Sequence, residues 1–128
     1  MVIASIWARP IGAQHGARDQ EWRVYSGDSG STKYAPLDQI NKDNVAKLRI
    51  AWRRPAVDKS LMAIDPKLTF SNNFRATPIM VKGVLYGPDG VGLVEAFNPA
   101  TGETIWVQQP FNAKELRGDS TRGVAYWT

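Results

Sequence analysis

The chain has 128 residues, enough for one ordinary domain, and its 43% hydrophobic and 22% charged content excludes disordered, collagen-like and coiled-coil proteins. Acidic and basic residues alternate along the sequence, so the net charge of +4 predicts a solvated mixed surface and no nucleic-acid partner. The sequence has no cysteine and one histidine, which excludes disulfides, thiolate metal sites and a zinc centre.

Residues 1–20 form a leader that we separate from the ordered chain. Met1–Trp7 is apolar and small residues follow it, which is the composition of the last part of a secretory signal peptide. The positive beginning and the longer apolar core of such a peptide are missing. Two interpretations stay open, a signal peptide that lacks its beginning and a flexible leader, and we favour the first.

Two strands and a short helix are predicted in the first half of the ordered chain. Trp22–Tyr25 is followed by a run of Gly, Ser and Asp over residues 26–31, which is typical of a strand that ends in a turn. Asn41 is a suitable N-cap for a short helix near residues 42–48. Apolar side chains then alternate with others over residues 48–52, which predicts a strand with one buried face.

The second half of the chain predicts a β-meander. Residues 56–75 show no clean period and are interpreted as a long loop. Four short apolar strands follow, over residues 78–81, 84–86, 93–97 and 104–107. Lys82–Gly83 and Gly87–Gly90 supply tight turns after the first two of these strands. Because nothing suggests a crossover helix between the strands, the sheet is predicted to be antiparallel.

The segment Ala96–Trp106 contains the most specific motif of the sequence. It reads Ala-Phe-Asn-Pro-Ala-Thr-Gly-Glu-Thr-Ile-Trp, in which Gly102 permits a tight turn and the terminal Trp offers a flat face for packing. This segment resembles the tryptophan-docking motif of the dehydrogenases that depend on pyrroloquinoline quinone (PQQ). Asn98 stands in place of the usual Asp of that motif.

Residues 22–52 and 122–127 resemble two further stretches of the same family, and the three segments occur in the family's order. The resemblance implies an all-β fold, an eight-bladed β-propeller, of which this chain supplies an antiparallel meander with one short helix. Residues 21–128 then form a partial propeller domain: part of the closing region, the first blade and the start of the second. Trp52 and Trp106 are expected to pack between blades.

The resemblance also implies a function. Family members oxidise alcohols or sugars by hydride transfer to PQQ, while Ca²⁺ polarises the reacting carbonyl and an Asp acts as the base. That Asp and the calcium ligands belong to later blades, so we assign no catalytic residue and no metal ligand to this chain and expect it to be inactive alone. The implied electron acceptor is a cytochrome c or a quinone. The implied location is the periplasm, with membrane association left open.

Two arginines are the candidate cofactor contacts. PQQ carries three carboxylates, and a guanidinium group is a permanent cation that can bind a carboxylate through two N–H donors. Arg122 matches the Arg of the family's Arg-Gly-x-Ala-Tyr-Trp stretch, which implies contact with PQQ; without the resemblance it reads as a surface residue. Arg75 precedes Ala-Thr-Pro, where many family members carry a Glu that faces the cofactor. It either contacts another carboxylate or is solvated.

Several alternatives stay open. The alcohol-oxidising branch often carries two adjacent Cys residues that this chain lacks, so the substrate is left open between alcohols and sugars. A scaffold propeller built from similar repeats would bind partners and no cofactor, but such proteins lack the stretches found here at residues 22–41 and 122–127. A free-standing small β domain would leave its sheet edges open, and on that ground we expect the isolated chain to be marginally stable or to aggregate.

Overall fold

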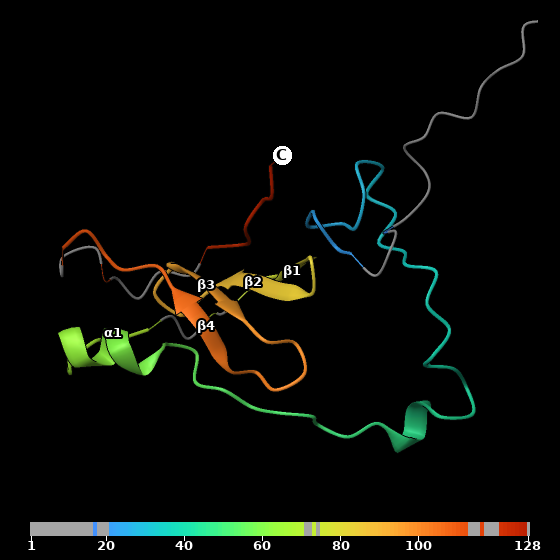
Figure 1. Ribbon diagram of the computed structural model, residues 1–128, viewed down its shortest axis with the longest axis horizontal. Helices are drawn as coiled ribbons and strands as arrows, with labels where there is room; N and C mark the ends of the chain where they lie inside the picture. Colours follow the sequence, from blue (N-terminus) through green and yellow to red (C-terminus); the bar gives the residue numbers. More distant parts are fainter. Residues whose placement is uncertain are drawn as a thin grey trace, which may run out of the picture.

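Figure 1 shows the computed structural model, which describes residues 17, 21–70, 73, 75–112, 116 and 121–127. Its centre is a four-stranded sheet in the order β1-β2-β3-β4, in which every neighbouring pair is antiparallel. The strands are β1 (Ile79–Val81), β2 (Val84–Pro88), β3 (Val94–Phe97) and β4 (Thr104–Val107). The predicted antiparallel meander is therefore confirmed. The predicted leader lies outside the described residues, apart from Ala17.

The two turns around β2 differ in how well the sequence predicts them. Lys82–Gly83 forms the predicted hairpin turn, and both of its residues have positive φ, 49° and 77°. The second turn begins later than predicted, because β2 continues through Pro88. The Asp89 carboxylate holds this later turn by accepting hydrogen bonds from the backbone N–H groups of Val91 (3.0 Å) and Leu93 (2.8 Å).

The turn between β3 and β4 contains the tryptophan-docking motif. Gly102 has a φ of 73°, and a Cβ atom at this position would lie 2.5 Å from the Trp52 ring, so the indole packs directly on the glycine. Trp52 Nε1 donates a hydrogen bond to the Pro99 carbonyl at 2.9 Å, and the ring meets Phe97 edge-on with 5.8 Å between centroids. Asn98, which stands in place of the usual Asp, stabilises the turn: its Oδ1 atom accepts a hydrogen bond from the Ala100 backbone N–H at 2.8 Å.

A short helix that the sequence does not predict packs against the turn between β2 and β3. This helix, α1 (Lys59–Ile64), begins at Asp58, whose carboxylate accepts the Ser60 N–H at 2.9 Å. The prediction of a loop over residues 56–75 is wrong over this stretch, because a helix of six residues is too short to show its period. The buried core around α1 consists of Val57, Leu61, Leu68, Val91, Leu93 and Leu116.

Residues 30–52 form an arm that leaves the sheet and returns to it (Figure 1). The helix predicted near residues 42–48 is a single 3-10 turn, η2 (Val45–Lys47). The strand predicted over residues 48–52 is wrong: no strand forms there, and Leu48 and Ile50 are 54% and 67% exposed. No described strand lies beside this stretch, so its alternating pattern has no sheet face to bury.

Two other predicted strand segments are reduced to single bridges. Trp22 pairs with Met80 of β1, but the chain turns at Val24, so no strand forms over residues 22–25. The predicted start of a second blade, residues 122–127, contributes one parallel bridge to the residues just before β1.

In the described part of the chain, no helix has the length and apolar character needed to cross a membrane.

Candidate functional site

A pocket of about 380 Å³ brings together Tyr25, Arg75 and Arg122. Two segments from far along the chain contact β1 and the residues just before it. The Thr77 N–H donates to the Arg122 carbonyl at 3.2 Å, and this contact places the C-terminal segment beside Arg75. The bridge from Trp22 to Met80 holds the segment that contains Tyr25 beside β1. The fold therefore gathers residues that are far apart in the sequence.

The described lining of this pocket is positively charged. Arg75 donates from Nε to the Asn73 side chain at 2.8 Å, which leaves its two terminal nitrogens without a partner among the described residues. The Arg122 side chain makes no hydrogen bond or ion pair with any described residue. Two like charges in one pocket repel each other, and an anion that enters the pocket relieves this repulsion. The structure thus brings both predicted site residues together, while their contact with a cofactor stays a prediction.

The chemistry of this pocket fits a ligand that carries several carboxylates. Arg75 and Arg122 can each bind one carboxylate through two N–H donors, and the Tyr25 phenol adds a neutral donor. These side chains can bind and orient an anion. The described residues include no group of three or more His, Asp or Glu side chains that could hold a metal, so they offer Ca²⁺ no ligand set.

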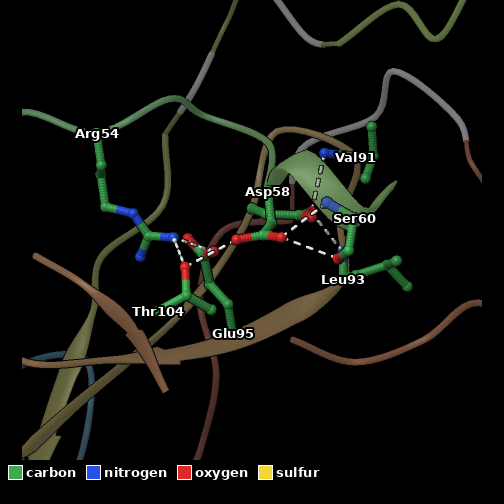
Figure 2. Close-up of polar contacts among 8 residues, drawn as sticks. Arg54, Asp58, Ser60, Val91, Leu93, Glu95 and Thr104 are labelled. Atoms are coloured by element: carbon green, nitrogen blue, oxygen red, sulfur yellow. Dashed lines mark hydrogen bonds and ion pairs between the residues drawn. The ribbon is translucent and has the colours of Figure 1, made fainter. Parts of the chain in front are cut away.

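A cluster of polar side chains lies where the arm returns to the sheet (Figure 2). Arg54 Nη2 forms an ion pair with Glu95 Oε2 at 2.7 Å, and the two side chains are only 15% and 8% exposed. The same nitrogen donates to the Thr104 hydroxyl at 3.1 Å, and Thr104 donates to Asp58 at 2.8 Å. The guanidinium also lies over the Phe97 ring, 4.5 Å from its centroid. Arg54, two residues after the arm, thereby connects this part of the chain to β3, to β4 and, through Thr104, to the N-cap of α1.

The carboxyl groups of this cluster have shifted pKa values. Burial raises the pKa of Glu95, although its ion pair with Arg54 acts in the opposite direction. Burial also raises the pKa of Asp89, against the effect of the backbone N–H groups that it accepts. The backbone N–H of Ser60 lowers the pKa of Asp58. Among the described residues of the cluster, one guanidinium therefore faces three carboxyl groups.

Sequence reasoning misses this cluster and also misses Tyr25. Glu95 interrupts the apolar strand 93–97, and a charged residue inside a buried strand is a signal that could reveal an ion pair. Arg54 follows Trp52 at a spacing that places both on one side of an extended chain, which is a weaker signal. No pattern in the sequence marks Tyr25, because only the fold brings it to the two arginines.

Comparison with known proteins points to one family of dehydrogenases. The family model "PQQ: Glucose/ethanol/alcohol dehydrogenase, beta-propeller domain" matches residues 22–128. The chain is 30% identical over 120 residues to the dehydrogenase subunit of alcohol dehydrogenase (quinone) from Gluconobacter oxydans (strain 621H), which covers 90% of this chain and 14% of that protein. It is also 30% identical to quinohemoprotein alcohol dehydrogenase from Comamonas testosteroni, over 88% of this chain and 15% of that protein. The chain thus spans only a small part of the length of these relatives.

Proposed function

The chain belongs to the PQQ β-propeller family of glucose, ethanol and alcohol dehydrogenases, and from this premise we propose that it forms part of the cofactor site of a PQQ-dependent oxidoreductase. The observation behind the proposal is the pocket in which Arg75 and Arg122 converge without a described carboxylate partner. The match over residues 22–128 supports a partial propeller domain over residues 21–128, with part of the closing region, the first blade and the start of the second.

Each residue of the pocket has a separate role in this proposal. Arg122 and Arg75 each bind one carboxylate of PQQ, so the two guanidinium groups fix the cofactor at two points and orient its ring. Tyr25 donates a hydrogen bond to an acceptor at the rim of the pocket. Bound PQQ supplies a quinone that accepts a hydride from the substrate. The cations also hold the negative charge of the cofactor in place during turnover.

The other parts of the reaction are proposed to come from outside this chain. They are Ca²⁺, which polarises the reacting carbonyl, and an Asp base, so the isolated chain binds PQQ but does not turn over substrate. The substrate is an alcohol or a sugar. The names of two relatives, alcohol dehydrogenase (quinone) and 1-butanol dehydrogenase (cytochrome c), support a quinone or a cytochrome c as electron acceptor. The apolar run Met1–Trp7 at the start of the leader, residues 1–20, motivates a periplasmic location.

The test is a titration of the purified chain with PQQ, followed by the absorbance of the cofactor. Arg122→Gln should weaken binding by at least about tenfold, because hydrogen bonds to charged groups contribute about 1.5–3 kcal/mol. Arg75→Gln should also weaken binding. Arg53→Gln, which removes an exposed arginine outside the pocket, is the matched control and should leave binding unchanged. Equal binding by all three variants refutes the site, and absence of binding to the wild-type chain favours a scaffold propeller.

A further inference from the structure

The C-terminal segment, residues 121–127, carries Arg122 and is joined to the sheet by little backbone pairing. Gly123 forms a single parallel bridge with Thr77, in which the Thr77 N–H donates to the Arg122 carbonyl at 3.2 Å. Residues 125–127 make no backbone hydrogen bond with any residue that the structure describes. Side-chain contacts of this segment therefore decide how firmly Arg122 is held in its pocket.

Tyr126 is the side chain through which a neighbouring segment reaches this part of the chain. Val124 and Tyr126 are partly buried, whereas Ala125 and Trp127 are exposed, so alternate side chains turn toward the protein. Tyr126 also lines a cavity of about 170 Å³ together with residues of β1, β2 and β3. The guanidinium carbon of Arg23 lies 5.6 Å from the centroid of the Tyr126 ring, within the range of a cation–π contact.

The guanidinium of Arg23 is held in place by the hairpin turn between β1 and β2. Its Nε donates to Glu21 Oε2 at 2.7 Å, and Glu21 Oε1 accepts the backbone N–H of Lys82 at 2.5 Å. The hydrogen bond from Arg23 lowers the pKa of Glu21, so this carboxylate stays ionised at neutral pH. Glu21 thus fixes the cation that contacts Tyr126.

The segment that carries Arg23 is itself anchored to β1. Trp22 and Met80 exchange two backbone hydrogen bonds, of 2.8 Å and 2.9 Å. The Trp22 indole donates from Nε1 to the Tyr25 carbonyl at 3.3 Å, and a Cβ atom at Gly27 would lie 3.1 Å from its ring. Arg23 therefore connects a well-anchored segment, which also carries Tyr25, to the weakly paired segment that carries Arg122.

We propose that Arg23 is a positioning residue for the pocket of Arg75 and Arg122. By its contact with the Tyr126 ring, Arg23 keeps the C-terminal segment beside β1 and Arg122 in the pocket, although Arg23 does not line the pocket itself. The inference rests on the proposed function in that it takes PQQ as the bound anion. Without the contact, the docked segment is less populated, and the apparent affinity for PQQ falls with the docked fraction.

Titration of the chain with PQQ tests this role. Tyr126→Leu removes the ring without changing any charge and should weaken PQQ binding by about two- to fivefold, the factor that corresponds to a cation–π contact at an exposed site. Tyr126→Phe keeps the ring and should bind PQQ as the wild-type chain does. Tyr34→Leu, which removes a ring that is 58% exposed on the arm, is the matched control. Unchanged binding by Tyr126→Leu overturns the proposal.

Two double variants separate positioning from a general loss of structure. In an Arg122→Gln background, Tyr126→Leu should cause no further loss of PQQ affinity, because the side chain that the contact positions is absent. Arg23→Gln combined with Tyr126→Leu should bind no more weakly than the weaker single variant, because both changes remove the same contact. A full additional loss in either double variant overturns the proposal.

Amide hydrogen exchange tests the same contact without PQQ. Because the Thr77 N–H is bonded to the Arg122 carbonyl, Tyr126→Leu and Arg23→Gln should each speed exchange at Thr77 by about two- to fivefold and leave the amides of β2 and β3 unchanged. If the wild-type chain does not bind PQQ, the proposed function fails, and exchange at Thr77 alone decides whether Arg23 holds the segment. Unchanged exchange in both variants overturns the proposal. If Tyr126→Leu does not fold, Arg23→Gln, at a side chain that is 49% exposed, gives the same test.

Discussion

Replacing Gly102 by Ala should destabilise the fold, because it forces the Trp52 indole off the docking turn. The φ of 73° at Gly102 is a left-handed conformation that costs an L-residue about 1–2 kcal/mol. The added Cβ would also lie 2.5 Å and 2.6 Å from two ring carbons of Trp52, which is too close for any real contact. Forced repacking of this kind costs about 1–3 kcal/mol, so the total loss in the free energy of unfolding should be about 2–5 kcal/mol.

Gly83→Ala is the matched control for this variant. Gly83 has a φ of 77°, nearly the same as Gly102, but nothing lies within 4 Å of its added Cβ. It should show the backbone cost alone, so the difference of about 1–3 kcal/mol between the two variants reports the contact with Trp52. In a Trp52→Ala background, Gly102→Ala should cost no more than Gly83→Ala.

Urea denaturation followed by far-UV circular dichroism measures these free energies. A stabilising osmolyte keeps the wild-type chain folded at the start of the titration if its stability is marginal. Equal losses for Gly102→Ala and Gly83→Ala in the presence of Trp52 would show that the indole does not pack on the turn. That result would refute the docking geometry on which the blade interpretation depends.

Three further substitutions test the buried polar cluster by urea denaturation. Arg54→Met should cost about 3–5 kcal/mol by leaving Glu95 buried and unpaired. Arg23→Met, at a more exposed ion pair of the same 2.7 Å length, should cost much less, because solvent screens that pair; equal losses would contradict this. Asp89→Asn should stabilise the chain at neutral pH by up to about 1 kcal/mol. Burial raises the pKa of Asp89 in the folded state, so the contribution of Asp89 to stability is lost as the pH rises through that value. A gain in stability that persists in acid would contradict this. Asp58→Ala should cost about 1 kcal/mol at neutral pH by removing the N-cap of α1. Because the pKa of Asp58 is lowered in the folded state, this cost should disappear as the pH falls through that value. A cost that does not change with pH would contradict the role of Asp58 as the cap.

The sheet could be predicted from the sequence because its determinants are local. Each strand from β1 to β4 follows the one before it, and turn residues such as Lys82–Gly83 and Gly102 stand between them. The strand predicted over residues 48–52 failed for the opposite reason, because an alternating pattern becomes a strand only beside a partner, and no described strand lies there. The helix α1 escaped prediction because six residues are too few to show a period.

The candidate site could be predicted only through the family resemblance. Arg75 and Arg122 are 47 positions apart, 122 − 75, and no spacing rule joins them; the backbone contact of Thr77 with Arg122 brings them together. The ion pair of Arg54 and Glu95 also spans 41 positions and depends on the return of the arm to the sheet. Contacts of this range follow from the tertiary fold, which periodicity and turn chemistry do not specify.

The central claim is that this chain holds PQQ by its carboxylates. The most direct measurement compares the binding of PQQ with that of its trimethyl ester, which keeps the ring and the quinone but carries no carboxylate charge. The account predicts that PQQ binds and is weakened by salt, while the ester binds at least about tenfold more weakly because the cations of Arg75 and Arg122 lose their partners. Equal binding of PQQ and the ester, independent of salt, would contradict it.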